Sequence, residues 1–416
     1  MSRHHHHSLH RTALATVILF VGCSPTFAGL LRPNPQTQLV ELNAKLGGRV
    51  VDFTNNHGCD RRIYSPALGE KRSMYVYLPP GYDGTTPFPA MLWLHGNGHD
   101  ERHALEIAEP FDVAIREGKM PPIIVIAPDG SVPNRPPLSS TGSFWLNSKS
   151  GRYEDYAVQD VWGFLIRNFA VRPERDAHAI FGASMGGFGA FGIAFKHRDI
   201  FGQIIGVMPV LNVRYLDCHG RYFANYRPDC VSWRTDFTHN RVIGRFYGVL
   251  VVREKKVLDP LLNYRRDDTL GFLQRENPVE LMLGRGIQPG EFGIFIGYGT
   301  KDEFNIDAQV EQFRDLAAGR GIATTIVTIP GGRHRMETAT KIFPQLATWL
   351  NTQLSPYVPV GYSPTSVCKC APQAAVRVYQ RPTVFVRPDG RPPIYPNLPI
   401  VSPVPGLPIP ASGPGR

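Results

Sequence analysis

Cysteine and long apolar stretches are scarce in this 416-residue sequence, and the chain between its two terminal segments has little net charge. Six cysteines are too few for a small domain held together by disulfides. The apolar run at 13–22 is too short to cross a bilayer. Residues 1–28 carry a charge of +2 and residues 355–416 carry +5, so the formal +10 of the chain leaves only +3 for the rest. That weak charge argues against nucleic acid as a partner.

Residues 1–28 have the composition of an export signal. Arg3, Arg11 and five histidines precede the apolar run, and small residues follow it. Two processing routes fit: cleavage after Ala28, or lipidation of Cys23. Either route predicts an exported protein, which is secreted, periplasmic or anchored to the envelope as a lipoprotein.

Export would permit disulfides. Outside the signal the cysteines are Cys59, Cys218, Cys230, Cys368 and Cys370. Because their number is odd, at least one is unpaired or pairs between chains. The sequence leaves the connectivity open.

Short apolar runs alternate with helical patterns through the body of the chain. Most runs are too apolar for strands with an exposed face, which favours a mostly parallel central sheet with helices on both faces. Strand candidates are 73–78, 90–94, 123–127, 177–181, 203–208, 293–298 and 325–329, and helix candidates are 104–117, 154–168, 184–196, 308–318 and 343–354. This alternation predicts an α/β fold.

Two segments depart from the alternation. Residues 211–283 are rich in aromatic residues and arginine, and we interpret them as an insertion between the sixth and seventh strands of the body. Residues 355–416 contain 15 of the 38 prolines, which predicts an extended, largely disordered tail. We therefore expect a signal at 1–28, a folded domain at 29–354 and a tail at 355–416. The tail, or a lipid on Cys23, would hold the protein near an anionic envelope; a tolerated disordered extension is the alternative.

The segment GASMGG at 182–187 has the Gly-x-Ser-x-Gly pattern that surrounds a nucleophilic serine. It follows the strand candidate 177–181 and begins a helix candidate, which is the setting in which such a serine occupies a tight turn. The glycines are needed because that turn has no room for side chains. The pattern predicts Ser184 as a nucleophile, and a serine at an ordinary turn is the alternative.

A base and an acid follow Ser184 in the chain order of α/β hydrolases. His334 comes after the strand candidate 325–329, from where its ring could reach back to Ser184. Asp302 comes after the preceding strand candidate, and Glu303 is the alternative acid. Three residues in this order, each after its own strand, predict a catalytic triad.

Donors for an oxyanion are expected in the loop after the strand candidate 90–94. Its segment HGNG at 95–98 and the residue after the nucleophile suggest the backbone N–H groups of Asn97 and Met185. A rival interpretation makes His95, His99 and His103 zinc ligands on a helix. Gly96 and Gly98 argue against a helix through His95, so we expect no metal.

With these motifs the chain resembles the putative esterase family of α/β hydrolases. That family includes esterase D types, feruloyl and acetylxylan esterases, siderophore esterases and the antigen 85 mycolyltransferases. The resemblance covers about 73–354 and rests on the segments 94–98, 153–156, 182–187, 297–304 and 332–334, and on Trp145. It implies an α/β-hydrolase fold and a serine esterase without a cofactor. By analogy Trp145 and Asn147 would line the substrate pocket, although Trp145 could equally be an ordinary core residue.

These observations predict an exported serine carboxylesterase that acts on a small-molecule or polysaccharide-linked ester, such as a feruloyl or acetyl ester. Ser184 would attack the ester carbonyl, His334 would take its proton and Asp302 would hold the imidazole. An acyltransferase of the mycolyltransferase type would use the same residues. A non-catalytic surface-binding protein on the same fold is a further alternative.

Overall fold

The computed structural model describes residues 35–133, 142–237, 239–247, 249–262 and 269–365. The predicted signal, including Cys23 and Ala28, and the tail beyond 365, including Cys368 and Cys370, lie outside the described residues. Within those ranges, every helix is too short or too polar to cross a membrane.

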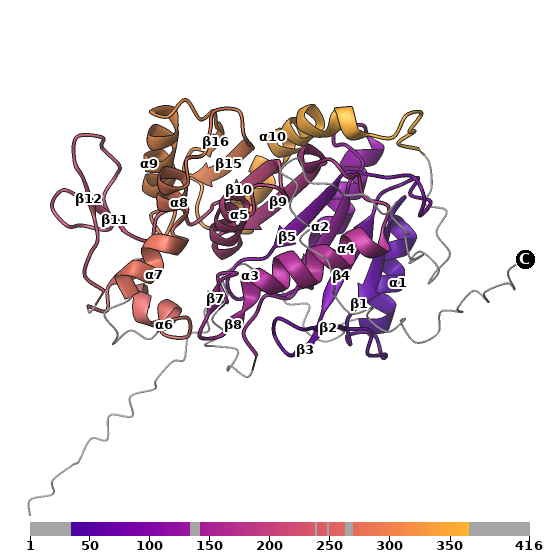
Figure 1. Cartoon of the computed structure of the whole chain (residues 1–416), viewed down its shortest axis with the longest axis horizontal. Coiled ribbons are helices and arrows are strands. Elements are labelled where there is room, and N and C mark those ends of the chain that lie inside the picture. Colours follow the sequence, from indigo (N-terminus) through magenta and orange to yellow (C-terminus); the bar gives the residue numbers. More distant parts are fainter. Residues whose placement is uncertain (1–34, 134–141, 238, 248, 263–268, 366–416) are drawn as a thin grey trace, which may run out of the picture.

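An eight-stranded sheet forms the centre of the molecule (Figure 1). Its order is β1-β4-β6-β5-β9-β10-β15-β16. The pairs β1/β4 and β4/β6 are antiparallel and all the other neighbours are parallel, which confirms the predicted mostly parallel sheet. The strands are β1 (Arg49–Phe53), β4 (Met74–Leu78), β5 (Ala90–Leu94), β6 (Ile124–Pro128), β9 (His178–Ala183), β10 (Gln203–Val207), β15 (Gly293–Gly299) and β16 (Thr325–Ile329).

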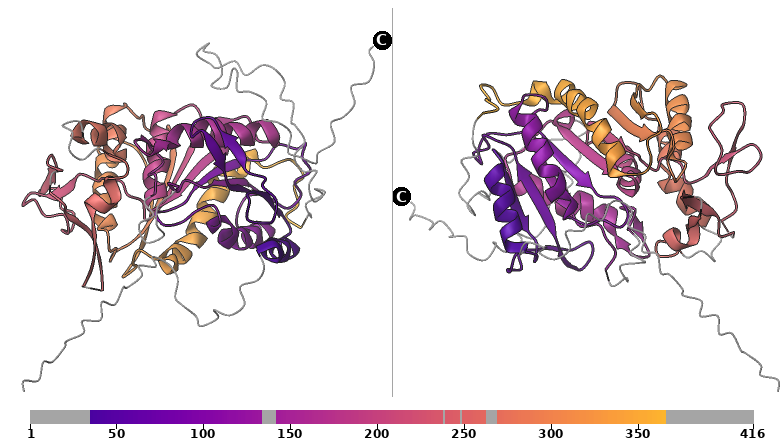
Figure 2. Two further views of the ribbon diagram at one scale, coloured as in Figure 1. Left: turned by 90° about the horizontal axis from the view of Figure 1, so that it is seen from below. Right: turned by 180° about the vertical axis from the view of Figure 1, so that it is seen from behind.

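Helices cover both faces of this sheet (Figures 1 and 2). On one face lie α1 (Pro35–Lys45), α2 (His103–Arg116) and α10 (Met336–Leu354), and on the other lie α3 (Tyr153–Asp155), the π-helix η2 (Tyr156–Trp162), α4 (Gly163–Asn168), α5 (Met185–Lys196) and α9 (Ile306–Ala318). Stacked rings join neighbouring helices: Phe111 of α2 lies 5.3 Å from Phe343 of α10. This layering is that of an α/β-hydrolase fold.

Two elements differ from those that the sequence predicts. The edge strand β1 was not expected, because its five residues are only partly apolar. The last helix begins at Met336 rather than at 343, so Pro344 lies inside it and not in its first turn. Burial of Thr338 and Ile342 on the added turns offsets the backbone hydrogen bond that Pro344 cannot donate.

The insertion lies between β10 and β15, which are the sixth and seventh strands of the sheet in chain order. Among the strand candidates, which did not include β1, they are the fifth and sixth. The insertion occupies the left end of the molecule in Figure 1. It contains the hairpins β11 (Tyr215–Asp217) with β12 (Val231–Trp233) and β13 (Val242–Phe246) with β14 (Leu250–Arg253), followed by α6 (Glu254–Leu258), α7 (Thr269–Glu276) and α8 (Pro278–Gly284). An ion pair between Arg234 and Glu254, each 3% exposed, stabilises it from within.

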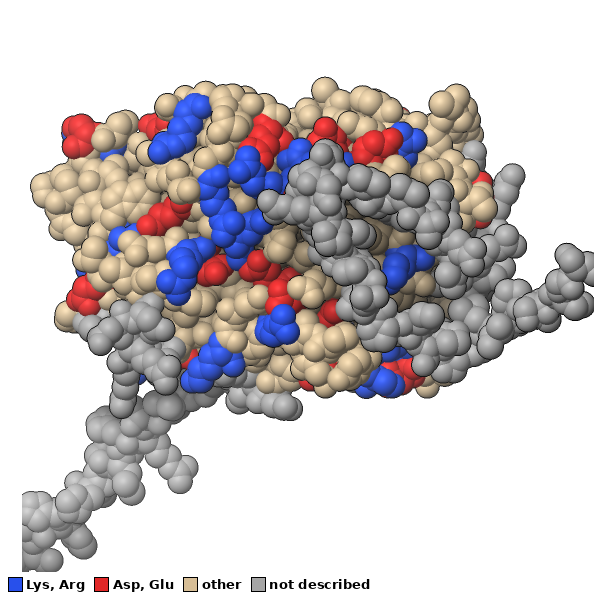
Figure 3. Space-filling model, viewed as in Figure 1, with Lys and Arg blue, Asp and Glu red and all other residues tan. Residues whose placement is uncertain are grey.

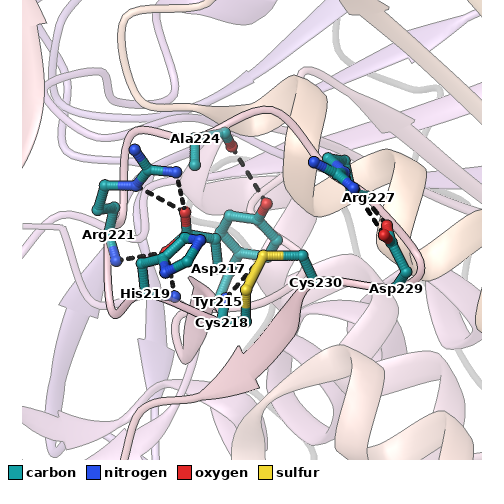
Figure 4. Close-up of a disulfide and its surroundings, with 9 residues drawn as sticks. All are labelled: Tyr215, Asp217, Cys218, His219, Arg221, Ala224, Arg227, Asp229 and Cys230. Atoms are coloured by element: carbon teal, nitrogen blue, oxygen red, sulfur yellow. Dashed lines mark hydrogen bonds and ion pairs between the residues drawn. A yellow bond between two sulfur atoms is a disulfide. The ribbon is translucent and has the colours of Figure 1, made fainter.

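A disulfide between Cys218 and Cys230 closes the β11–β12 loop (Figure 4). Inside the loop the carboxylate of Asp217 accepts hydrogen bonds from the side chain and backbone of Arg221, and the Tyr215 hydroxyl donates to the Ala224 carbonyl. Cys59 is free and exposed. The disulfide therefore limits the freedom of a loop that carries the neighbouring rings of Tyr222 and Phe223.

Small hairpins and short helical turns complete the described chain. They are β2 (Ile63–Ser65) with β3 (Glu70–Arg72), β7 (Asn147–Ser148) with β8 (Gly151–Arg152), and the 3₁₀ turns η3 (Arg175–Ala177) and η4 (Ser355–Tyr357). On the face shown in Figure 3, basic and acidic side chains are interspersed.

Candidate active site

Ser184 lies on a sharp turn between β9 and α5. Its φ of 53° is in the left-handed region, which a residue with a Cβ adopts only under strain. Its neighbours must be glycine: a Cβ on Gly182 would lie 1.9 Å from the Gly186 carbonyl oxygen, and one on Gly186 would lie 2.0 Å from that of Leu94. The turn therefore holds the Ser184 hydroxyl out at the carboxyl end of the parallel strands.

His334 connects Ser184 to Asp302. Its Nε2 lies 2.9 Å from Ser184 Oγ, and its Nδ1 lies 2.7 Å from Asp302 Oδ2. The imidazole is 6% exposed and the Asp302 side chain is fully buried. The three residues that the sequence singled out are thus joined in one chain of hydrogen bonds.

Glu303 has a different position from Asp302. Its carboxylate accepts a hydrogen bond from the backbone N–H of His334 at 2.8 Å and contacts Arg333 at 3.1 Å. Glu303 therefore holds the backbone of the histidine loop, whereas Asp302 holds the ring.

The charges around His334 favour its protonated form. Burial alone would lower the pKa of His334, but the carboxylate of Asp302, supported by that of Glu303, raises it above its ordinary value of 6.5. A base with a raised pKa accepts a proton from a serine hydroxyl more readily.

Two close backbone approaches bring together the loop after β15, which carries Asp302, and the loop after β16, which carries His334. A Cβ on Gly299, at the end of β15, would lie 2.3 Å from the Gly332 carbonyl oxygen. The N–H of Lys301 donates to that same carbonyl at 2.9 Å. Glycine at both positions lets the loops after β15 and β16 pack directly on each other.

The loop after β5 lies beside the nucleophile. A Cβ on Gly96 would lie 3.6 Å from the Ser184 Cβ, so the loop passes next to the serine. The Asn97 side chain accepts a hydrogen bond from the Gly142 N–H at 2.6 Å. Within the described chain, the N–H groups of Asn97 and Met185 donate to no other residue. Two donors at this place suit a developing oxyanion.

His95 holds that loop in place through hydrogen bonds at both of its ring nitrogens. Its Nε2 accepts the Gly130 N–H at 2.8 Å, so Nδ1 carries the proton and donates to the Gly96 carbonyl at 2.9 Å. Burial lowers the pKa of His95, which keeps the ring neutral. Sequence reasoning identified this histidine only as a zinc candidate, and both of its ring nitrogens are occupied.

The other two histidines of the zinc interpretation, His99 and His103, are not arranged as zinc ligands on a helix either. Helix α2 begins only at His103, and the rings of His99 and His103 stack with centroids 4.3 Å apart. Among the described residues, the one group with metal-ligand spacing is Cys218, His219 and Cys230, whose two cysteines form the disulfide.

The two expected pocket residues occupy different environments. Trp145 has no exposed surface, and its indole N–H donates to the His95 carbonyl at 3.3 Å. A Cβ on Gly130 or Gly189 would clash with its side chain, so Trp145 fills the space behind the loop that follows β5. Asn147 is exposed on β7 and its amide oxygen accepts the N–H of Asp155 at 3.2 Å.

Phe304 and Tyr222 join the insertion to His334 and Asp302 through contacts that the sequence did not predict. The Phe304 ring contacts His334 with centroids 4.9 Å apart. Its carbonyl accepts the Tyr222 hydroxyl at 2.8 Å, and Asn305 donates to the Tyr222 carbonyl at 2.7 Å. Tyr222 comes from the loop that the disulfide closes, and the spacing between 222 and 304 gives no sign of this contact.

Residues 65–349 match the model of a family described as "putative esterase". Among curated relatives, the dipeptidyl-peptidase 5 of Porphyromonas gingivalis is 26% identical over 53% of this chain and 31% of its own length. Esterase Rv1288 of Mycobacterium tuberculosis is 31% identical over 37% of this chain and 33% of its own length. The chain thus matches about a third of the length of these relatives.

Solved structures show the same fold. A ferulic acid esterase superposes with a TM-score of 0.54 and 15% identity over 74% of this chain and 99% of its own. An S-formylglutathione hydrolase from Agrobacterium tumefaciens gives a TM-score of 0.51 and 17% identity over 74% of this chain and 96% of its own. Both likenesses confirm the α/β-hydrolase architecture.

Proposed function

The chain belongs to the putative esterase family of ester-hydrolysing enzymes, and on that premise we propose that it is a serine carboxylesterase with Ser184, His334 and Asp302 as its catalytic triad. The observation that carries the proposal is the unbroken set of contacts from Ser184 Oγ through His334 to Asp302. Each of the three residues follows its own parallel strand, so the sheet positions the group.

In the first step Ser184 Oγ attacks the ester carbonyl carbon while His334 Nε2 takes the hydroxyl proton. Asp302 keeps the Nδ1 proton in place and stabilises the imidazolium that forms. The N–H groups of Asn97 and Met185 would bind the oxyanion. Collapse of the tetrahedral intermediate expels the alcohol, which receives the proton from His334 and leaves an acyl-serine.

In the second step a water molecule loses a proton to His334 and attacks the acyl-serine. The second tetrahedral intermediate collapses by expelling Ser184 Oγ, which takes the proton back from His334, and the carboxylic acid is released. The same N–H donors serve the second oxyanion. Every proton transfer uses the one imidazole, which must be neutral at the start of each step.

The substrate we propose is a small or polysaccharide-linked carboxylic ester, of the feruloyl or acetyl kind. The ferulic acid esterase whose fold the chain shares supports this choice of compounds to test. A panel of p-nitrophenyl esters, feruloyl esters and acetylated xylan, each assayed with and without a sugar acceptor, separates hydrolysis from acyl transfer.

A fluorophosphonate probe tests the nucleophile directly. It should label the wild-type protein at Ser184, and Ser184→Ala should abolish labelling and lower kcat by about 10³- to 10⁶-fold. Turnover that persists in Ser184→Ala at the wild-type rate would refute the proposal.

We also propose that the protein is exported, because residues 1–28 have a basic start, an apolar run and small residues after it. Mass spectrometry of the mature N-terminus distinguishes the two routes. Cleavage after Ala28 leaves Gly29 first, whereas lipidation leaves a diacylated or triacylated Cys23. An intact Met1 in protein recovered from its native cell would contradict both.

A further inference from the structure

Exposed apolar side chains gather at one place on the described surface. The large apolar side chains that are exposed there are Val40, Tyr64, Tyr247, Val249, Val251, Met336 and Val360. Three of these seven, Tyr247, Val249 and Val251, lie on the β13–β14 hairpin. Met336, at the start of α10, directly follows Arg335, whose guanidinium contacts the Tyr247 ring. We call these four residues the hairpin patch. Apolar residues scattered singly over a surface are ordinary, but a group of them marks a binding surface.

The alternation of the hairpin explains why the patch faces outward. Arg245 pairs with Val251, and Phe246 pairs with Leu250. Partners in an antiparallel pair share a face, so Arg245, Val251 and the other exposed residues lie opposite to Gly244, Phe246 and Leu250. The hairpin therefore has two apolar faces, and one of them is covered.

The covered face packs on the active site. The ring of Phe246 lies 5.3 Å from that of Phe304, and a Cβ on Gly244 would lie 2.6 Å from the Phe304 ring. Phe304 in turn contacts His334, and the Arg245 N–H donates to the Glu303 carbonyl at 2.9 Å. These contacts fix the hairpin to Glu303 and Phe304, which directly follow Asp302 in the chain.

The patch also reaches the histidine loop. The Arg335 guanidinium lies 5.2 Å from the centre of the Tyr247 ring, and Arg335 directly follows His334. Met336 is the next residue and is 40% exposed. Whatever contacts Tyr247 and Met336 is therefore close to the loop that carries the proposed catalytic base.

The charge around the patch is positive. Residues 241–256 contain Arg241, Arg245, Arg253, Lys255 and Lys256, and their single acidic residue is Glu254. Glu254 is buried and paired with Arg234, so its charge is already neutralised. The contacts of the three arginines are with carbonyl groups and a ring: Arg241 donates to the Gly220 carbonyl and Arg253 to the Asn240 carbonyl. The Arg245 guanidinium lies 4.4 Å from the centre of the Phe223 ring. An apolar tip with a cationic border fits a layer of anionic lipid.

We propose that the hairpin patch binds an anionic lipid layer and places Ser184 next to esters held in that layer. A second copy of the chain fits less well, because a two-fold contact would bring the same arginines together. The binding surface stands on its own, while delivery of an ester to Ser184 rests on the proposed function.

Sedimentation with lipid vesicles tests the surface. The full chain carrying Ser184→Ala is mixed with vesicles of phosphatidylcholine alone, or of phosphatidylcholine with about one third phosphatidylglycerol. This chain should bind the anionic vesicles, and adding Tyr247→Ser with Val249→Ser should weaken binding by about tenfold or more. Because every variant keeps both termini, the N-terminal segment and the basic tail contribute equally throughout.

Matched controls separate the patch from general effects. Val40→Ser with Tyr64→Ser removes two other exposed apolar side chains, on α1 and β2, and should leave binding unchanged. Arg245→Gln with Arg253→Gln should weaken the preference for the anionic vesicles, and the basic tail that all variants share keeps part of it. With Ser184 restored, the Tyr247/Val249 variant should hydrolyse soluble p-nitrophenyl acetate at the wild-type rate, which shows that it folds.

Three results would overturn the proposal. The first is equal vesicle binding by the Ser184→Ala chain with and without the Tyr247 and Val249 substitutions. The second is an equal loss of binding in the Val40/Tyr64 control, and the third is a wild-type dimer in light scattering that the patch variant converts to monomer. Failure of the proposed function has another signature. In that case Ser184→Ala would leave ester hydrolysis unchanged, while the vesicle results would still stand.

Discussion

Replacing each of the two adjacent acids separates their roles. Asp302→Asn keeps the shape of the side chain but removes the charge next to His334 Nδ1, 2.7 Å away. A charge pair about 4 Å apart is worth about 4 kcal/mol at an effective dielectric constant of ~20. This energy corresponds to about 10³ in rate. We therefore expect kcat to fall by about 10²- to 10⁴-fold.

Glu303→Gln should be mild. The glutamine oxygen can still accept the His334 N–H, and the lost charge was shared with Arg333 and with Arg335 at 3.8 Å. We expect less than a tenfold loss in kcat, since a single hydrogen bond contributes about 1 kcal/mol. Its visible effect should be on the pH profile, because Glu303 helps to raise the pKa of His334.

The pH dependence has a definite sign. His334 must be neutral to act as a base, so kcat/KM should rise with pH through an apparent pKa above 6.5. Removing the Glu303 charge lowers that pKa, which moves the rising limb to lower pH. Steady-state rates with a p-nitrophenyl ester between pH 5 and 9 measure both quantities. A larger loss of kcat in Glu303→Gln than in Asp302→Asn, or a flat profile with chemistry rate-limiting, would refute the assignment.

Two further predictions concern the groups that hold the triad in place. Gly186→Ala should lower Tm by more than about 10 °C and abolish activity, because the new Cβ would lie 2.0 Å from a backbone oxygen. Gly284→Ala should change neither Tm nor activity, because a Cβ there would have no atom within 4 Å. Cys218→Ser with Cys230→Ser should lower the free energy of unfolding of the insertion by about 3 kcal/mol, because the disulfide no longer closes the loop. The same variant should reduce kcat, because Tyr222 of this loop donates a hydrogen bond to the Phe304 carbonyl next to the proposed triad. Tyr222→Phe, which keeps the disulfide, should reduce kcat alone, and an unchanged kcat in both variants would show that the insertion does not position the acid loop.

The three residues of the proposed triad could be singled out from the sequence because each follows a buried strand. An apolar run bounded by turn residues marks the end of a parallel strand, and those ends meet at one edge of the sheet. Ser184, Asp302 and His334 could therefore be grouped from their order alone. The predicted strands agree with the structure to within about two residues for the same reason.

The choice between Asp302 and Glu303 depended on the turn after β15. The Phe304 N–H donates to Asp302 Oδ1 at 2.8 Å, which fixes the side chain toward the His334 ring. Glu303 then points to the histidine backbone. Neighbouring acids in a loop have no periodicity that would distinguish them, so only the folded turn separates them.

The insertion was recognised by its composition, but its internal structure was not. Strands of three residues such as Tyr215–Asp217 are too short for an alternation to be read. The pairing of Cys218 with Cys230 was one of several that the sequence allowed. The outward apolar face of the β13–β14 hairpin follows from its register, which the sequence does not show.

The end of the folded domain is testable by truncation. The described chain continues past α10, and the ring of Tyr362 packs on that of Phe88, 6.0 Å away. Phe88 and its neighbour Tyr82 are 1% and 0% exposed. Removal of Tyr362 would uncover part of this cluster.

Two truncated chains should therefore behave differently. A chain that ends at Thr365 should keep the wild-type Tm and kcat, because it retains Tyr362. A chain that ends at Leu354 loses one aromatic pair and its buried area, about 1–3 kcal/mol, which predicts a Tm lower by roughly 2–8 °C with kcat unchanged. Calorimetry and a p-nitrophenyl ester assay measure both quantities. A fall in Tm for the chain ending at Thr365 would mean that residues beyond 365 pack on the body, and the boundary of the folded domain would then have to be moved toward the C-terminus.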